Sequence, residues 1–295
     1  MRTEGQRRSD NFEDRGRGSG GGAVPAGALF ALISRLGIRG MLIVAIIGAV
    51  VWFAFPGMRG SLLGLIGVDS GGSTQGAGSV CAAEAQACDF SRTILASTED
   101  VWAAQFQQGR LPTYGAQVSA YQNPKLVVFQ QGVATGCGAA TSDVGPFYCP
   151  ADGNLYVDPG FFVVMRDRLH SPGDFAQAYV IAHEVGHHVQ KQIGATERSI
   201  PGENQNQTSV RIELQADCFA GVWGHTAQAQ LAIDEADLRE ALNAAHSIGD
   251  DTLGARESQY THGTSAQRMT WFRRGFDSGD ARQCDTFAAR DYRQL

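Results

Sequence analysis

The chain has 295 residues, of which 43% are hydrophobic and 18% charged, and its formal net charge is −6. This length allows one or two domains with a sizeable core, and the composition excludes a fully disordered chain and a polytopic membrane protein. The mild acidity argues against a nucleic-acid partner, because phosphate recognition usually shows as a basic face.

The N-terminal part of the sequence predicts a tail followed by a membrane segment. Residues 1–28 are rich in arginine and glycine, which predicts a disordered tail. Residues 40–58 contain no charged side chain and are bracketed by Arg39 and Arg59. As a helix this stretch would be about 28 Å long, which predicts one uncleaved transmembrane anchor. A buried soluble helix and a cleaved signal peptide are disfavoured, because the stretch has no polar face and no cleavage site follows it.

The charges and the cysteines together predict a topology. Residues 1–40 carry seven arginines against four acids, which favours a cytoplasmic tail and an extracytoplasmic domain in a single-pass protein of the cell membrane. All six cysteines follow the predicted anchor, where an oxidising compartment permits three disulfides. The sequence does not decide the pairing; the one we favour is Cys137 with Cys149, Cys218 with Cys284, and Cys81 with Cys88.

A glycine-rich linker at residues 59–80 is predicted to lead into a folded domain at residues 81–295. Hydrophobic periodicity predicts mainly helices in this domain, with strands at 125–131 and at 154–164, the second interrupted by Pro159. Cap residues, prolines and glycines set the helix ends. The predicted helices span residues 82–95, 98–108, 172–193, 208–230, 235–248 and 265–277.

The main candidate metal-binding and catalytic residues lie in the predicted helix 172–193. It contains His-Glu-Val-Gly-His, an H-E-x-x-H motif. His183 and His187 are one helical turn apart on one face, so both can bind a single Zn²⁺. Glu184 lies on the adjoining edge, where it can take a proton from water at the metal without being a ligand. The alternative, a pair of surface or core histidines, is disfavoured because the motif lies within a well-capped helix.

The next predicted helix supplies a candidate third ligand. Glu213 and Asp217 are four residues apart and share a face, in a stretch that continues with the apolar sequence CFAGVW. Buried carboxylates need partners, and a metal site provides one. We expect Glu213 to bind the zinc and Asp217 to accept a hydrogen bond from a ligand histidine, which fixes its tautomer.

Other polar residues have more than one interpretation. His262, in the loop sequence THGTS, could donate a hydrogen bond to a tetrahedral oxyanion or serve as a loop or capping residue. Arg211 could pair with one of the two carboxylates of its helix or lie at the surface. His188 points off the ligand face and is expected to be structural, and turn roles are expected for Asp250 and Asp251.

The sequence resembles the bacterial family of putative neutral zinc metallopeptidases, which are membrane-anchored proteins of zincin type. The resemblance covers residues 81–295 and the N-terminal tail, and it rests on short blocks spread along the chain. These blocks are RRSDNFEDR (7–15), TEDVW (98–102), GPFYCPADGNLYVD (145–158), GDFAQAYVIAHEVGHHVQ (173–190), ELQADCFAGVW (213–223), IGDD (248–251) and THGTSAQR (261–268).

This resemblance implies an α+β fold, a predominantly helical zincin-like domain with a small β element, in this chain preceded by one transmembrane helix. It also implies a His-His-Glu zinc site and hydrolysis of peptide bonds. An extended peptide would pair with a strand edge beside the metal helix, and residues 154–158 are our candidate for that strand. The alternative function is a catalytically inert zinc-binding scaffold. It is disfavoured because a structural site usually has four protein ligands, whereas this sequence offers three with an intact Glu184.

Overall fold

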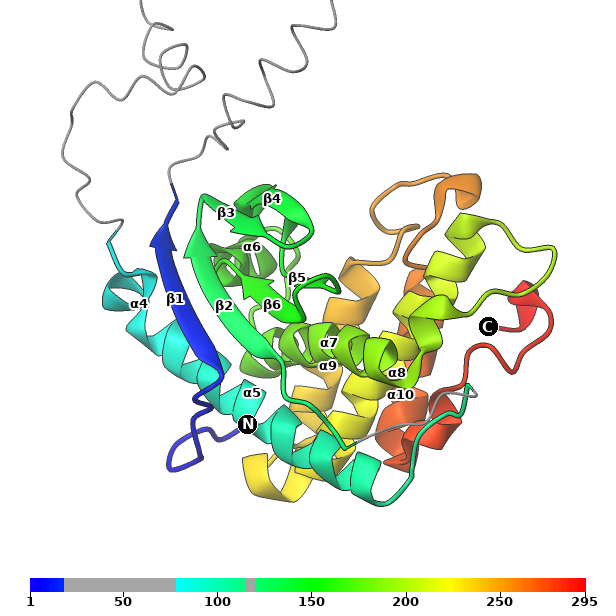
Figure 1. Ribbon diagram of the computed structural model, residues 1–295, viewed down its shortest axis with the longest axis horizontal. Helices are drawn as coiled ribbons and strands as arrows, with labels where there is room; N and C mark the ends of the chain where they lie inside the picture. The colour runs from blue at the N-terminus through cyan, green and yellow to red at the C-terminus, as the bar shows by residue number, and fades with distance from the viewer. Residues whose placement is uncertain (19–77, 115–119) are drawn as a thin grey trace, which may run out of the picture. The chain divides into compact units, whose positions relative to one another are not determined.

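The computed structural model describes residues 1–18, 78–114 and 120–295. Residues 1–17 and 79–295 form one compact unit, in which helices pack against a four-stranded sheet (Figure 1). Its helices are α4 (Val80–Ala83), α5 (Ala85–Gln107), α6 (Gly160–Asp167), α7 (Asp174–Ile193), α8 (Gln205–Leu231), α9 (Glu235–Ser247) and α10 (Ser265–Ser278). Its strands are β1 (Phe12–Arg17), β2 (Lys125–Gln130), β3 (Gly132–Thr135), β4 (Gly138–Thr141), β5 (Phe147–Cys149) and β6 (Asn154–Val157).

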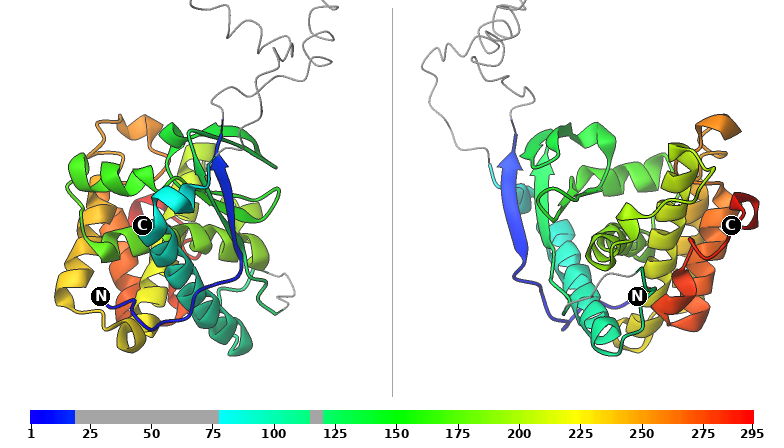
Figure 2. Two further views of the ribbon diagram at one scale, coloured as in Figure 1. Left: turned by 90° about the vertical axis from the view of Figure 1, so that its left-hand side faces the viewer. Right: turned by 45° about the vertical axis from the view of Figure 1, so that its right-hand side comes forward.

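The sheet has the strand order β1-β2-β6-β5. The pairs β1–β2 and β2–β6 are parallel, β5 runs antiparallel to β6, and β3 and β4 form a separate antiparallel hairpin. Figures 1 and 2 show β1 at the outer edge of the sheet, with α5 on the same side of the molecule. The opposite edge is β5, which contacts α7. The sheet therefore presents a strand edge to the helix that carries the H-E-x-x-H motif.

The N-terminal residues belong to this unit, which corrects the prediction that they are part of a disordered tail. β1 pairs in parallel with β2, with one irregularity between Asp14 and Arg17. Arg7 forms an ion pair with Glu99 at 2.9 Å, and Arg8 forms one with Asp89 at 2.6 Å. The arginines whose composition predicted a solvated tail are thus paired with acids about 80 to 90 residues further along the chain.

The predicted membrane topology is wrong. A single crossing by residues 40–58 would put β1 and β2 on opposite sides of a bilayer, whereas the two strands pair in one sheet. Residues 40–58 themselves lie outside the described residues, and among the described ones no helix is both long and apolar enough to cross a membrane. In the described ranges the α+β fold therefore includes no transmembrane helix, and the predicted single-pass localisation with a cytoplasmic tail is withdrawn.

One continuous helix, α5, covers most of the two helices predicted at 82–95 and 98–108. Ser97, the residue expected to cap the second helix, lies inside α5 and is 1% exposed. Its hydroxyl accepts a hydrogen bond from the Trp223 indole N–H at 3.0 Å. Because a distant helix supplies this partner, the serine does not interrupt the backbone of α5.

The second half of the predicted strand 154–164 is a helix. β6 ends before Pro159, and α6 starts directly after this residue, whose φ of −56° fits a first helical turn. Asp158 Oδ1 accepts the N–H of Gly160 at 2.8 Å, which helps to close that turn. The apolar sequence that follows therefore continues as a helix and buries Phe162 against the core.

The other long helices agree with their predictions within about three residues at each end. α7 ends at Gly194, which has the left-handed φ of 77° typical of a helix C-terminus. α8 starts after Asn204, whose side chain caps the N–H of Gln207. α9 and α10 have capping boxes led by Asp234 and Thr264. The ends of α7 and α8, which carry the candidate ligands, are thus determined by local sequence signals.

α8 and α10 pack closely against each other. A Cβ atom added to Gly221 on α8 would lie 2.7 Å from the backbone nitrogen of Phe276. One added to Gly275 on α10 would lie 2.9 Å from the backbone nitrogen of Val222. Real Cβ atoms do not approach backbone this closely, so the two glycines allow the helices to touch.

We expect Gly275→Ala to destabilise the protein although alanine is the better helix former. Overpacking against a fixed backbone should lower the free energy of unfolding by roughly 1–3 kcal/mol, measured by urea denaturation. Gln228→Ala on the exposed face of α8 is the control and should change it by less than about 0.5 kcal/mol. Equal stability of the glycine variant and wild type would show that the helices can separate without cost.

All three favoured disulfides are confirmed. Cys81 pairs with Cys88, Cys137 with Cys149, and Cys218 with Cys284. The second joins the β3–β4 hairpin to β5, and the third joins α8 to the segment that follows α10. The edge strand beside α7 and the helix that carries Glu213 are both covalently braced.

Candidate metal centre

Three candidate ligands converge. His183, His187 and Glu213 each offer a donor atom, and these atoms all lie within 4.8 Å of one another. Glu213 Oε2 lies 3.2 Å from His183 Nε2, and its Oε1 lies 3.5 Å from His187 Nε2. Zinc bonds of about 2.0–2.1 Å in a tetrahedral site separate the donors by about 3.3 Å, so these residues fit zinc. Within the described ranges no other group of three or more such donors is found.

Two helices position these side chains. α7 supplies the histidines one turn apart, and α8 supplies Glu213. Between the histidines lies Gly186, where an added Cβ would be 3.1 Å from the backbone of Ala216 on α8. A larger residue there would push α8 away, so the glycine within the motif helps to bring Glu213 within reach of the histidines.

Hydrogen bonds fix the orientation of both rings. His183 Nδ1 lies 2.9 Å from Asp217 Oδ1, and His187 Nδ1 lies 2.8 Å from Gln190 Oε1. Both acceptors take an N–H, so each ring donates from Nδ1 and presents Nε2 towards Glu213. This arrangement is typical of zinc-binding histidines.

Asp217 is the centre of a buried network. The Tyr179 hydroxyl donates to its Oδ1 at 2.6 Å, and Arg268 donates to both carboxylate oxygens at 2.9 Å. Asp217 is fully buried, and burial alone would raise its pKa, but Arg268 and His183 together lower it. Asp217 therefore stays ionised and holds the ring of His183 in place.

The ligand side chains also shift the pKa values of one another. Burial disfavours a charged His183, but the carboxylates of Asp217 and Glu213 outweigh burial and raise the pKa of this ring to about 10. Burial likewise opposes an ionised Glu213, yet His187, His183 and Arg268 lower its pKa. The Glu213 carboxylate is thus ionised at neutral pH.

Glu184 lies beside the convergent donors and is only 8% exposed. Burial raises its pKa, although the two motif histidines and the backbone N–H of Tyr148 act in the opposite direction. A carboxyl group whose pKa lies above the ordinary value is a better proton acceptor at neutral pH. Glu184 is therefore the candidate general base.

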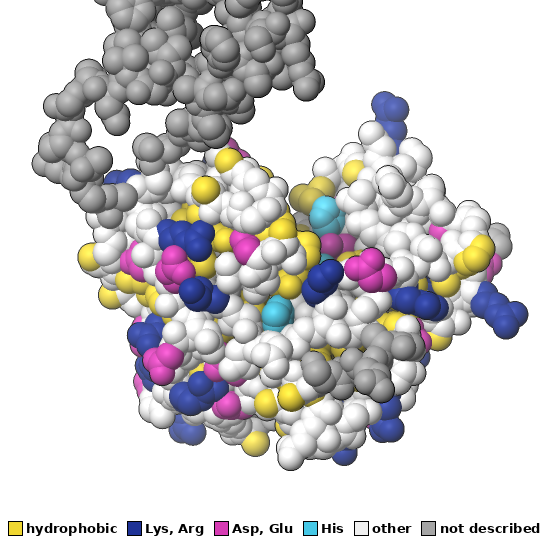
Figure 3. All heavy atoms as spheres, viewed as in Figure 1, with side chains coloured by type: hydrophobic (Ala, Val, Ile, Leu, Met, Phe, Trp, Pro, Cys, Tyr) yellow, Lys and Arg dark blue, Asp and Glu magenta, His cyan; other side chains and the backbone are white. Residues whose placement is uncertain are grey.

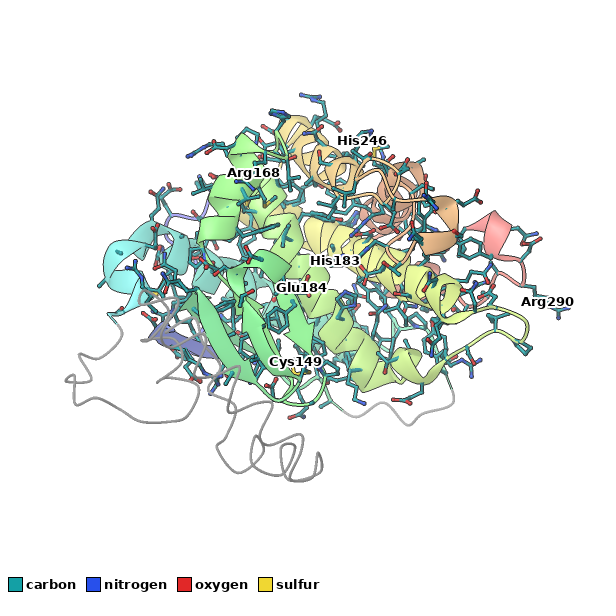
Figure 4. All side chains as sticks on the ribbon, turned by 90° about the horizontal axis from the view of Figure 1, so that it is seen from above. Cys149, Arg168, His183, Glu184, His246 and Arg290 are labelled. Carbon is teal, nitrogen blue, oxygen red and sulfur yellow. A yellow bond between two sulfur atoms is a disulfide. The ribbon has the colours of Figure 1, made fainter. Side chains whose placement is uncertain are left out.

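A cavity of about 420 Å³ opens over this group. The motif side chains and Glu213 line it together with the apolar side chains of Val144 and Leu253, each 60% exposed. Figure 3 shows a hollow between two sides of the molecule, with histidine and acidic side chains in it. In Figure 4 the labelled His183 and Glu184 lie on α7 in the middle of the molecule.

Arg211 and His188 both have partners other than the candidate zinc ligands. Arg211 pairs with Glu203 instead of a carboxylate of its own helix. His188 contacts the Tyr148 hydroxyl at 3.2 Å and the backbone oxygen of Gln122 at 2.6 Å, as expected of a structural histidine.

Three residues around the ligands were missed in the sequence. Tyr179 lies four residues before His183, and Gln190 lies three after His187, so helical spacing could have identified both. Arg268 comes from α10, and no spacing rule relates it to α8.

Comparisons with known proteins identify a family for this chain. The chain matches the family described as "Putative neutral zinc metallopeptidase" over residues 1–287. It is 47% identical to the uncharacterized protein YpfJ of Escherichia coli K12, over 97% of this chain and 99% of that protein. It is 40% identical to the uncharacterized protein Mb2605 of Mycobacterium bovis, over 64% of this chain and 73% of that protein.

No solved structure matches the chain. The family match includes β1, both ligand helices and the loop that carries His262, so it covers every part of the candidate site. The chain therefore belongs to the putative neutral zinc metallopeptidase family.

Proposed function

We propose that this protein is a zinc-dependent peptidase that hydrolyses peptide bonds, with His183, His187 and Glu213 as zinc ligands and Glu184 as general base. The observation that carries the proposal is the convergence of three ligand atoms beside a buried glutamate in an open cavity. The third ligand comes from the helix after the motif, as in gluzincin-type sites.

Zinc held by these three residues would act as a Lewis acid, lowering the pKa of water and polarising a carbonyl group. Glu184 would accept a proton from the attacking water as the new carbon–oxygen bond forms. It would then deliver this proton to the leaving amine as the carbon–nitrogen bond breaks. Asp217 and Gln190 would hold the two ligand rings in place throughout.

An extended substrate needs a strand edge to pair with. Residues 154–158 were the candidate, but β6 pairs with both β2 and β5 and has no open edge, so that prediction is wrong. The edge strand is β5, and Phe147 and Tyr148 of this strand line the cavity. We propose that the substrate adds to β5, with apolar side chains meeting Val144 and Leu253.

An inert zinc-binding scaffold is the alternative function. A structural zinc site is usually closed by a fourth protein ligand, and the described residues bring only three donors together. The proposed enzyme therefore explains the buried Glu184, which a structural site would not need.

Removing the metal should abolish peptidase activity. We expect 1,10-phenanthroline to eliminate cleavage of a fluorescently labelled casein and one equivalent of zinc to restore it, because the ligands provide only the site for the Lewis acid. The non-chelating 1,7-isomer is the control. Cleavage that persists in the chelator would contradict a zinc mechanism, and a zinc-loaded protein inert on all peptides would favour the scaffold.

A further inference from the structure

Residues 145–148, which we call the β5 wall, line one side of the cavity above the candidate zinc ligands. They lead into β5, the edge strand that contacts α7, and in Figure 4 this strand at Cys149 lies beside the helix that carries Glu184. A strand edge usually offers both N–H donors and carbonyl acceptors to an added chain. The partners of the N–H groups in the β5 wall therefore decide how a peptide can pair with it.

The backbone of Tyr148 points to the open edge of the sheet. Where β5 turns back into β6, the Cys149 carbonyl accepts the N–H of Gly153 at 2.9 Å, so the backbone of Cys149 points towards β6. Backbone directions alternate along a strand, so the N–H and C=O of Tyr148 both point the other way. The Tyr148 N–H is directed at the carboxylate of Glu184. Only the carbonyl of Tyr148 is left for a substrate.

The other N–H groups of the β5 wall are not available either. The N–H of Gly145 donates to the Ser142 carbonyl at 3.2 Å, and Pro146 has no N–H. Phe147 pairs with Tyr156, so its N–H points into the sheet. Among the residues that the structure describes, the β5 wall thus presents carbonyl oxygens to the cavity and no uncommitted N–H.

The β5 wall is held in place from both sides. The Tyr148 hydroxyl lies 3.2 Å from Nδ1 of His188 on α7. The next residue, Cys149, is fully buried and is bonded to Cys137 in the β3–β4 hairpin. The carbonyl groups of the wall therefore keep a fixed direction.

The opposite wall of the cavity is fixed as well. It belongs to the segment between α9 and α10 and includes Leu253 and His262. The buried Asp250 accepts the backbone N–H of His262 at 2.7 Å. Asp251 accepts the N–H of Ser265 at 2.7 Å, at the start of α10. Both aspartates, for which turn roles were expected, hold this loop, so a peptide in the cavity lies between two fixed walls.

Proline at a sheet edge has a simpler explanation, because it also prevents strands of two proteins from pairing. That explanation would account for Pro146. It does not account for the Tyr148 N–H, which is directed into the cavity at Glu184. The edge lacks these two donors for different reasons, and both positions lie in the wall that faces the zinc ligands.

We propose that the β5 wall binds a substrate only through N–H groups of the peptide, so that the substrates are extended peptides without proline at two positions. The Tyr148 carbonyl accepts the N–H of a substrate residue beside the scissile bond, because Tyr148 adjoins the proposed base. The Pro146 carbonyl accepts the N–H two residues away, since alternate residues of a paired strand face the same way. This inference rests on the proposed peptidase function.

The test uses the wild-type full-length protein and a peptide that spans one of its cleavage sites in casein. In one series of analogues, each backbone N–H outside the scissile bond is replaced in turn by an ester oxygen. We expect two esters, two residues apart, to lower kcat/KM by about three- to tenfold each, because each removes one hydrogen bond, and the others to change it less than about twofold. Proline at either of these two positions should lower kcat/KM by more than about tenfold, because its ring also occupies the space of the lost hydrogen.

A second series replaces each carbonyl oxygen outside the scissile bond by sulfur, which is a weaker acceptor. The β5 wall has no N–H for these groups, so no thioamide in the two critical residues should change kcat/KM by more than about twofold. Thioamide losses there as large as the ester losses, or an ester series without two sensitive positions, would overturn this mode of recognition and leave the peptidase assignment intact. A wild-type protein that cleaves neither casein nor any of the peptides would instead overturn the proposed function itself.

Pro146→Ala gives the β5 wall one N–H. In this variant one thioamide that is tolerated by wild type should lower kcat/KM by about threefold, because the new N–H finds an acceptor in the substrate. Pro150→Ala is the matched control, since Pro150 follows β5, is exposed and does not line the cavity. It should show no new thioamide sensitivity. Equal thioamide profiles for the Pro146 variant and wild type would contradict the place assigned to Pro146 in the wall.

Discussion

Glu184→Gln is expected to lower kcat for peptide cleavage by about 10³–10⁴-fold while the protein keeps its zinc. Glutamine has nearly the same shape, so the three proposed ligands and the cavity should be unchanged. It cannot accept a proton, however, and both proton transfers assigned to Glu184 would be lost. Measuring kcat together with zinc content by elemental mass spectrometry separates loss of the base from loss of the metal.

Glu197→Gln is the matched control for this variant. Glu197 follows the same helix, its side chain is 74% exposed, and its carboxylate makes only a 3.5 Å contact with Lys191. We expect its kcat to stay within about twofold of wild type. Undiminished activity of the Glu184 variant would rule out that residue as the base.

Arg268→Met should destabilise the metal-free protein more than Gly275→Ala. Methionine fills much of the same volume but leaves the fully buried carboxylate of Asp217 without its principal cation. Removing one partner of a buried ion pair typically costs about 3–5 kcal/mol. We expect a loss of that size in the free energy of unfolding, measured by urea denaturation in the presence of a chelator.

The same helix provides the control for this prediction. Arg273 on α10 pairs with Asp277 four residues later, and both side chains are more than half exposed. Arg273→Met should change the free energy of unfolding by less than about 0.5 kcal/mol. If the two variants were equally stable, the Arg268–Asp217 pair would not support the site.

The zinc ligands were predictable because local rules fix them. The four-residue spacing of His183 and His187 places both on one helix face, and the buried stretch around Glu213 demands a partner for its carboxylate. The structure brings these three residues together. Arg268 could not be found in this way, because only the packing of α10 against α8 brings it to Asp217.

The same difference between local signals and long-range packing explains which helices and strands could be predicted. α7 and α8 have strong signals at their ends, and both were predicted within about three residues. β1 was missed because the strand that it pairs with, β2, lies far along the chain. The misplaced break at Ser97 has the same origin, since its partner Trp223 belongs to another helix. Partners far along the chain determine whether β1 forms and whether α5 continues through Ser97. A local sequence pattern does not reveal those partners.

The membrane topology was predicted from hydropathy and charge alone, and strand pairing overturned it. A hydropathy analysis considers residues 40–58 alone and takes no account of the chain on either side of them. The pairing of β1 with β2 requires residues 12–17 and 125–130 to lie in one folded unit. A topology rule applied to one segment cannot detect that constraint.

Anomalous diffraction at the zinc edge from crystals of the zinc-loaded protein tests the central claim most directly. We expect one zinc per chain, bound by His183 Nε2, His187 Nε2 and a Glu213 oxygen, with the remaining coordination position open to the cavity and Glu184 beside it. A zinc ion bound elsewhere, or one closed off by a fourth protein ligand, would contradict the assignment of this site as a peptidase centre.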